Sequence, residues 1–508
     1  MRVEFKKVVS AYSLRAFFIT KFASFQRIRS ERLKLAVRLP KSIAPVRPRF
    51  RLVSKASDIS LKEILSRDAA GEILERFCKD QNFLKQTDDE GNTMLHLVIK
   101  LNARRCARLI CTLNACDEPW LSRNSHGETP IQMNEQSEIA DDLRILTSNF
   151  DIERESKFWM SDLNEELIEE RLRDSNSTKE ILVALDGGGI KGAAEIMALR
   201  ELSLRLSSTS PSITSLFKSF DWIGGTSVGA VIAAFSAPRH HENGSQSPDT
   251  NLGSFLAETR ATFHPKLKKP SFRGELLHKS LREHVGTSRL GDIEAKFVCT
   301  SVDGAMIPPR LLVFRNFPIE VQTDEDHREV EIVDALMAST ASPLLLPVSP
   351  LGLSDGGVLA KNPSLVLLTE YHRFYAKAVR HPTPSLFLSL GTGYNEARRT
   401  SGIHFGDLPK NRVFFDWHFM RTTKNLFDVF VSQSTSGDTA CLDQAAAWCL
   451  ATRSPYFRIN PPNINRLSLT CTDAEKVADF LWGVMVYLRT TARHDLDQLA
   501  SFIKRLKS

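Results

Sequence analysis

The chain has 508 residues, of which 42% are hydrophobic and 25% are charged. This length predicts two or three structural units, because single domains usually hold about 100–200 residues, and the composition is typical of a globular protein. No apolar run approaches the roughly 18 residues that a membrane-spanning helix requires. We therefore expect any contact with a membrane to be peripheral.

The eight cysteines form no Cys-x-x-Cys pair and no Cys/His grouping with zinc spacing. Reduced thiols in an intracellular protein are the expected state. The sequence also lacks a His-Glu-x-x-His helix and a calcium-binding loop pattern. It therefore predicts neither a metal nor a cofactor.

The positive charge is concentrated at the N-terminus. Residues 1–55 hold 15 Lys or Arg and two Glu, a net charge of +13, so residues 56–508 carry 7 − 13 = −6. Arg-rich, Ser-containing, acid-poor beginnings are typical of mitochondrial targeting segments; an arm lying on anionic lipid and a solvated tail without a role are the alternatives. We expect residues 1–57 to be a basic arm or targeting segment of a mitochondrial or cytoplasmic protein. Nucleic-acid binding is disfavoured, because the basic excess is confined to this segment.

Residues 58–150 contain two related segments. In each, a turn glycine lies two residues before a threonine that we expect to start a short helix, Thr93 in the first and Thr129 in the second. Their separation of 129 − 93 = 36 residues is close to the roughly 33-residue period of ankyrin repeats, which these segments resemble. His96 is interpreted as a capping or packing residue of the repeat. So short an array rarely buries its own faces, so we expect it to dock on the rest of the chain.

The pattern changes after an acidic helical linker at 151–180. The apolar run Ile181–Leu185 predicts a buried parallel strand, and a glycine turn and an apolar helix at Ala193–Leu206 follow it. A second strand-like segment, Phe220–Gly224, again leads through a glycine turn into a helix. This repetition predicts a layered α/β catalytic domain over residues 181–508. Further buried strands are expected at Lys296–Ser301 and Ser385–Leu390.

The second glycine turn carries a candidate nucleophile. Gly225-Thr-Ser227-Val-Gly229 matches the nucleophile elbow, in which a serine lies on a strand-to-helix turn so tight that small residues must flank it. The N-terminus of the following helix favours a developing negative charge. Ser227 is therefore the predicted nucleophile, and Gly225 and Gly229 form the elbow.

A serine nucleophile needs a base within hydrogen-bonding reach. Asp355, followed by two glycines, is the candidate that we favour over an ordinary turn aspartate. An unperturbed aspartate is a weak base, so we expect its proton affinity to be raised or Ser227 to donate to it directly. A Ser/His/Asp lipase or thioesterase is the alternative, with His372, His404 or His418 as the base.

The first glycine turn is a candidate oxyanion hole. The bare backbone N–H groups of Gly187, Gly188 and Gly189 can converge on the oxygen that becomes negative when an ester carbonyl is attacked. Lys191 could add positive charge there, or it could be a solvated lysine. The same loop fits a dinucleotide-binding fingerprint, but the next strand does not end in the expected acidic residue, so nucleotide binding is disfavoured.

These motifs, in this order, resemble the patatin-like phospholipases. The ankyrin-like segments, the Leu390-Gly-Thr-Gly393 turn, the Ala445–Cys449 segment and the Tyr456–Pro461 segment are similar to the calcium-independent group VI phospholipase A2 in particular. The resemblance implies a three-layer α/β catalytic domain and a Ser/Asp dyad. It also implies calcium-independent hydrolysis of a glycerophospholipid acyl ester, through an acyl-enzyme, to a fatty acid and a lysophospholipid.

One departure from the family pattern concerns the base. Lys361 stands where the family motif usually has the first Asn before Asn362-Pro363. A cation near Asp355 would stabilise the carboxylate and lower its basicity. An ankyrin-bearing interaction protein with an inactive hydrolase domain is therefore a further alternative.

Partners of three kinds follow from the sequence. We expect a phospholipid membrane surface, and a protein partner or a second copy of the chain bound through the ankyrin-like repeats. Residues 411–430 combine aromatic and basic side chains and could form an interfacial or calmodulin-binding helix. An aromatic helix packed into the core is the interpretation that we favour for them.

Overall fold

The computed structural model describes most of the chain. The described residues are 61–114, 118–147, 158–174, 178–207, 212–240, 251–319, 326–379, 381–395, 437, 440–463 and 466–507. The expected basic arm at 1–57, His404, His418 and the 411–430 segment lie outside these residues. Among the described helices, none has both the length and the hydropathy needed to cross a bilayer.

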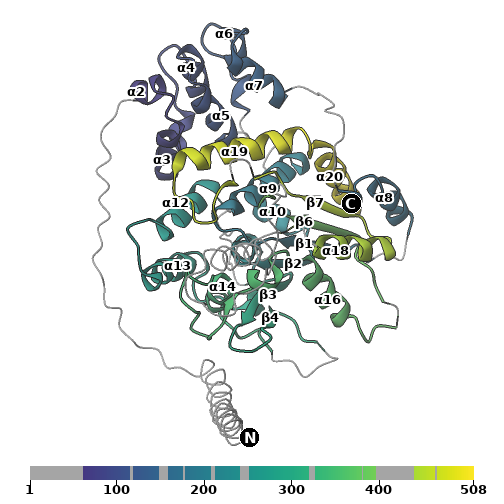
Figure 1. The fold of residues 1–508 in the computed structure, drawn as a ribbon. Coiled ribbons are helices and arrows are strands. Elements are labelled where there is room, and N and C mark those ends of the chain that lie inside the picture. Colours follow the sequence, from purple (N-terminus) through teal and green to yellow (C-terminus); the bar gives the residue numbers. More distant parts are fainter. Residues whose placement is uncertain are drawn as a thin grey trace, which may run out of the picture.

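A seven-stranded sheet lies at the centre of the molecule (Figure 1). Its order is β4-β3-β2-β1-β6-β7, and β5 pairs with β3. Five neighbouring strands, β3, β2, β1, β6 and β7, are parallel, whereas β4 and β5 run antiparallel to β3. The bounds are β1 Ile181–Leu185, β2 Trp222–Thr226, β3 Lys296–Asp303, β4 Arg310–Arg315, β5 Ser354–Asp355, β6 Leu386–Leu390 and β7 Tyr456–Ile459.

Helices cover both faces of the sheet, because the central strands are apolar on both sides. Ile181, Val183 and Leu185 of β1 belong to one hydrophobic core, and Leu182 and Ala184 belong to the other. The first core is completed by α9 Ala193–Leu206, α10 Ile213–Phe217, α11 Val228–Ser236, α12 Leu252–Thr262, α13 Pro270–Val285, α14 Ile332–Thr340, α19 Ala474–Arg489 and α20 Arg493–Lys507. The second is completed by α8 Asn164–Arg173, α16 Ser364–Phe374 and α18 Ala440–Ala451. The sheet and its two helical layers thus form a three-layer α/β arrangement, as expected.

The elements expected from apolar runs agree with the structure in different degrees. β1 and α9 have the predicted bounds, β3 extends two residues past its prediction, and β2 begins two residues later than predicted. The strands β4, β5 and β7 were not expected. Three short elements complete this part of the chain: the helix α15 Gly357–Ala360 and the 3₁₀ turns η4 Gly189–Gly192 and η5 Leu290–Asp292. A further 3₁₀ turn, η1 Gln81–Lys85, lies in the helices that precede the sheet.

A helical module precedes the sheet in the sequence, and α19 lies between this module and the sheet in Figure 1. Its helices are α2 Leu61–Ser66, α3 Ala70–Lys79, α4 Met94–Lys100, α5 Arg104–Leu113, η3 Pro119–Leu121, α6 Pro130–Met133 and α7 Glu138–Thr147. Thr93 and Thr129 each begin a helix in a capping box, which satisfies backbone groups that the first turn leaves open. His96 belongs to the first box, and its Nε2 lies 3.0 Å from the carbonyl oxygen of Glu128. This histidine is buried and packs within the module, as its interpretation required.

The module packs through α3 and α5 on the helices that cover the sheet. The backbone N–H of Gly71 donates to the Glu475 carboxylate of α19 at 2.6 Å, and Arg105 pairs with Asp479 of α19 at 3.0 Å. Glu75 of α3 also pairs with Arg260 of α12. The expected contact between the repeat-like segment and the rest of the chain is therefore present.

Candidate active site

Ser227 lies between the end of β2 and the first residue of α11. Its backbone has φ 53° and ψ −122°, a conformation that a non-glycine residue adopts only under strain. The chain passes so close to its neighbours that side chains would collide on either side of the serine. A Cβ on Gly225 would lie 2.4 Å from Ala230 Cα, and one on Gly229 would lie 2.4 Å from the carbonyl oxygen of Leu185. The glycines of the elbow are therefore a steric requirement.

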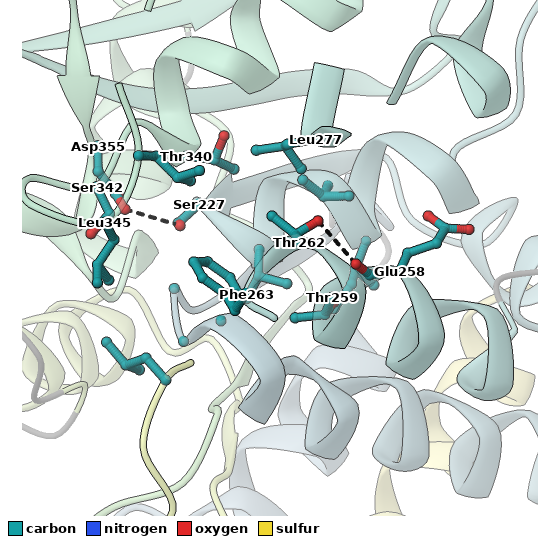
Figure 2. Close-up of a pocket in the computed structure, with 18 of the residues that line it drawn as sticks. Ser227, Glu258, Thr259, Thr262, Phe263, Leu277, Thr340, Ser342, Leu345 and Asp355 are labelled. Atoms are coloured by element: carbon teal, nitrogen blue, oxygen red, sulfur yellow. Dashed lines mark hydrogen bonds between the residues drawn. The ribbon is translucent and has the colours of Figure 1, made fainter. Parts of the chain in front are cut away.

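Asp355 accepts a hydrogen bond from Ser227. Its Oδ2 lies 3.1 Å from Ser227 Oγ, although the two residues are 128 positions apart in the chain (Figure 2). The two-residue strand β5 pairs Asp355 with Ser301 of β3, which fixes its backbone at the same end of the sheet as the serine. The other carboxylate oxygen, Oδ1, accepts the N–H of Gly357 at 2.7 Å. Both oxygens are thus oriented by donors.

Burial raises the pKa of Asp355 to about 6, while the hydrogen bonds from Gly357 and Ser227 favour the charged form and lower it. The residue as a whole is only 7% exposed. Loss of hydration disfavours the carboxylate, so the group holds a proton more strongly than an exposed aspartate does. The expectation that Lys361 would lower the basicity of Asp355 was wrong, because burial outweighs every influence on this carboxyl.

The loop between β1 and α9 lies beside the serine, but its first amide is already used. The N–H of Gly187 donates to the carbonyl oxygen of Lys361 at 2.9 Å, so the expectation that Gly187 donates to an oxyanion was wrong. The N–H groups of Gly188 and Gly189 donate to no acceptor among the described residues. These two amides are therefore the donors that the loop offers to a ligand.

Close neighbours require glycine at these two positions. A Cβ on Gly188 would lie 2.2 Å from Thr392 Oγ1, and one on Gly189 would lie 2.3 Å from the carbonyl oxygen of Leu469. Gly189 also has φ +57°, which favours glycine. Thr392 in turn donates to the carbonyl oxygen of Gly187 at 2.9 Å.

A buried ion pair anchors the start of this loop. Asp186 and Arg458 form two hydrogen bonds, of 2.7 and 3.1 Å, and both side chains are almost fully buried. Arg458 lies on β7, and its guanidinium also donates to Ser389 of β6. Neither residue was predicted from the sequence to have a role. Arg458 belongs to the Tyr456–Pro461 segment, which was noted, like Leu390–Gly393, only for its similarity to the family.

The two lysines near the site differ from their expected roles. Lys191 is buried, and burial together with the nearby Lys361 lowers its pKa to about 7, so it is not a solvated lysine. It does not line the cavity in front of Ser227, whereas Lys361 does. Of these two lysines, only Lys361 lines the cavity, and Arg239 is a second basic residue in its wall.

The serine and the aspartate lie in a cavity of about 730 Å³ (Figure 2). Its walls come mainly from apolar side chains of α11, α12, α13 and the segment after α14, among them Val231, Phe255, Phe263, Leu277 and Leu345. Glu258, Ser280 and His284 form a hydrogen-bonded group in its wall. A cavity of this size and character suits an apolar chain with a polar reacting group at one end.

No histidine in the described part of the chain hydrogen-bonds to Ser227. His372 lies on α16 and packs against Trp448 on the other face of the sheet, and burial lowers its pKa to about 4. It does not line the cavity. Within the described residues, no group of three or more His, Cys, Asp or Glu side chains is arranged to hold a metal ion.

Comparison with known proteins agrees with this geometry. Residues 183–368 match the family model of the patatin-like phospholipases. The chain is 27% identical to an intracellular phospholipase A2 of Caenorhabditis elegans over 347 residues, which cover 65% of this chain and 30% of that protein. It is 26% identical to the 85/88 kDa calcium-independent phospholipase A2 of Mus musculus over 350 residues, which cover 62% of this chain and 40% of that protein.

A plant relative aligns over more of its own length. Patatin-like protein 1 of Oryza sativa subsp. indica is 26% identical over 295 residues, which cover 50% of this chain and 67% of that protein. The chain spans less than half the length of the worm and mouse relatives. The segment shared with the family contains both Ser227 and Asp355. Residues 183–368 are therefore similar to the patatin-like phospholipase domain.

Proposed function

We propose that the chain hydrolyses acyl esters of glycerophospholipids to a fatty acid and a lysophospholipid without calcium. The observation that carries this proposal is the 3.1 Å hydrogen bond from Ser227 to a buried carboxylate at one end of a largely apolar cavity. The names of the worm and mouse relatives, both phospholipases A2, supply the substrate class. A lipid acyl chain fits the apolar walls, and its ester carbonyl would then lie near Ser227.

The first half of the reaction forms an acyl-enzyme. Asp355 Oδ2 takes the proton of Ser227 Oγ as that oxygen attacks the ester carbonyl carbon. The carbonyl oxygen becomes negative and accepts hydrogen bonds from the N–H groups of Gly188 and Gly189. When the tetrahedral intermediate collapses, the bond to the lysophospholipid oxygen breaks. That oxygen leaves with the proton held by Asp355.

The second half releases the fatty acid. A water molecule gives its proton to Asp355 and attacks the acyl carbonyl carbon, and the same two amides receive the negative oxygen. The bond to Ser227 Oγ then breaks, and Asp355 returns its proton to the serine. The raised pKa of about 6 suits both proton transfers, because a base works best when its pKa lies near the working pH.

The test compares variants of the two proposed catalytic side chains. Ser227→Ala and Asp355→Asn should each reduce fatty-acid release from phosphatidylcholine vesicles to background, and a calcium chelator should leave the wild-type rate unchanged. Ser215→Ala and Asp89→Asn, which change exposed side chains elsewhere, serve as matched controls. A fluorophosphonate probe should label the wild-type chain but not Ser227→Ala. Turnover retained by either catalytic variant would reject the dyad.

We further propose an organisation in four parts: a basic arm at 1–57, ankyrin-like repeats at 58–150, a linker at 151–180 and the catalytic domain at 181–508. Support for the repeats comes from the two capping boxes and from Gly91 and Gly127, whose positive φ angles mark equivalent turns. We propose an intracellular location with peripheral membrane association. A reporter fused to residues 1–57 would reject mitochondrial import if it stayed diffuse in the cytosol.

A further inference from the structure

Exposed apolar side chains and lysines form a surface that shares one residue, the exposed Leu344, with the wall of the cavity. We define this basic apolar patch as Lys266, Lys268, Lys269, Phe272, Leu344 and Val348. We propose that the patch docks on an anionic phospholipid bilayer and brings the cavity to its substrate. This inference rests on the proposed function and identifies the surface that meets the lipid.

Two segments far apart in the sequence form the patch. Residues 263–273 connect α12 to the first turns of α13, and residues 342–348 follow α14. They are in direct contact, because Arg273 donates to the carbonyl oxygen of Leu345 at 3.3 Å. A Cβ on Gly274 would lie 2.5 Å from Pro347 Cγ, so the second segment packs closely on the start of α13.

Each segment also contributes to the wall of the cavity. Phe263 lines it from the first segment, and Leu344 and Leu345 line it from the second. Figure 2 shows Phe263 and Leu345 in the same cavity as Ser227 and Asp355. Because Leu344 is exposed and also lines the cavity, a flat surface that covers the patch would lie against this part of the cavity wall.

The apolar members of the patch are unusually exposed. Leu344 is 83% exposed, Val348 63% and Phe272 42%. Leu344 has φ +68°, a conformation that bulky residues rarely adopt, and it is fixed there by hydrogen bonds from the Leu345 and Leu346 N–H groups to Ser342. A strained turn that directs a leucine into water needs a function, and insertion among lipid acyl chains would provide one.

The charge around these side chains complements anionic headgroups. Residues 261–274 contain four Lys or Arg and no Asp or Glu, and residues 342–354 contain no charged residue. This local excess contrasts with the net charge of −6 carried by residues 56–508. Lys266, Lys268 and Lys269 are exposed. Each lysine close to an anionic membrane strengthens binding about fivefold.

A bilayer fits the patch better than an acidic protein does. A protein bound across Leu344 would cover an exposed residue of the cavity wall and hinder the substrate there. A bilayer supplies the substrate at that place, and its headgroup layer can accept both the lysines and the apolar tips. Occupation of the patch by lipid is therefore compatible with turnover.

The first experiment measures binding of the full chain to vesicles by sedimentation, in the Ser227→Ala background so that lipid is not consumed. Adding phosphatidylserine to phosphatidylcholine vesicles should strengthen binding, and high salt should weaken it. The triple variant Lys266→Gln/Lys268→Gln/Lys269→Gln should need about a hundredfold more anionic lipid for half-maximal binding. Lys62→Gln/Lys218→Gln/Lys476→Gln removes the same net charge from other elements and should bind almost as the parent does. Equal losses in the two triple variants would overturn the proposal.

The second experiment locates the contact without any substitution in the patch. Hydrogen exchange of the Ser227→Ala chain should slow in residues 264–273 and 342–353 when anionic vesicles are added, and residues 61–114 should be unaffected. Unchanged exchange in both patch segments would overturn the proposal, and protection by a soluble acidic protein alone would assign the patch to a protein partner.

A third measurement separates this inference from the proposed function. With wild-type Ser227, the patch triple variant should hydrolyse a water-soluble short-chain ester at the parent rate but should be slower on anionic vesicles. A Phe272→Ser/Val348→Ser variant should behave in the same way, with Leu121→Ser as the control for an exposed leucine elsewhere. If the parent fails on the soluble ester, the proposed function fails, while the binding data still decide the patch.

Discussion

Replacing Asp355 by asparagine should stabilise the fold while it abolishes activity. The buried carboxyl has a pKa raised to about 6, so its charged form is disfavoured in the folded protein. Asparagine has nearly the same shape. Its oxygen can accept the Gly357 N–H, and its amide can donate to Ser227 Oγ, so both hydrogen bonds of the native side chain have replacements.

The magnitude follows from the difference between the folded and unfolded pKa values. An unfolded aspartate has a pKa of about 3.9, so the shift of about two units corresponds to about 3 kcal/mol. Below pH 3.9 both states are protonated, and the carboxyl contributes no difference. As the pH rises towards about 6, the unfolded state ionises first, so the wild type loses stability relative to the variant. The full penalty is present above the folded pKa.

The assay is urea unfolding followed by tryptophan fluorescence at pH 5 and pH 8. The stability gain of Asp355→Asn over the wild type should increase by about 1.5 kcal/mol between these pH values, whatever the constant effect of the substitution on packing. Asp89→Asn, which removes an exposed carboxylate, controls for the loss of one negative charge. A gain that does not change with pH would show that Asp355 is not buried as a high-pKa carboxyl, and the argument for it as the base would lose its support.

Three further outcomes follow from the same contacts. Turnover of a water-soluble ester should fall about tenfold from pH 7 to pH 5 as Asp355 is protonated; initial rates that stay level would contradict its assignment as the base. Gly188→Ala should lower kcat about a hundredfold or more, because the new Cβ would displace an oxyanion donor, whereas Gly304→Ala, which meets no atom closer than 3.7 Å, should keep the parent kcat. Arg458→Gln should lower the free energy of unfolding by about 3–5 kcal/mol, because it leaves the Asp186 carboxylate buried without its partner; adding Asp186→Asn should recover much of this loss in urea unfolding.

The central part of the fold could be predicted because its signals are local. The five-residue apolar run of β1 and the apolar helix α9 are bounded by glycines and polar residues, so their limits are visible in the sequence. β5 has only two residues and no strand pattern, and it exists because Ser301 of β3 offers a pairing edge 54 positions away. β7 was likewise missed, because its pairing with β6 depends on the folded sheet.

In the site, too, some residues could be predicted from local sequence, whereas contacts between distant positions could not. Ser227 and Asp355 could be named because each is marked by flanking glycines that the local backbone requires. The use of the Gly187 N–H by the Lys361 carbonyl, and the anchoring of Asp186 by Arg458, join positions more than 170 residues apart. Lys361 was expected to act on Asp355 through its charge. Its backbone has the clearer effect, because its carbonyl holds the glycine loop.

The helix α12 connects the helical module to the cavity. Arg260 pairs with Glu75 of α3, and Gly253 packs so closely on the module that a Cβ would lie 3.1 Å from the ring of Phe77. The cavity side of the same helix carries Phe255 and Thr259. A fragment without residues 61–147 would expose the module-binding side of α12 to water and remove the packing that positions the cavity wall. Acyl-chain binding should therefore depend on residues of the module that do not line the cavity.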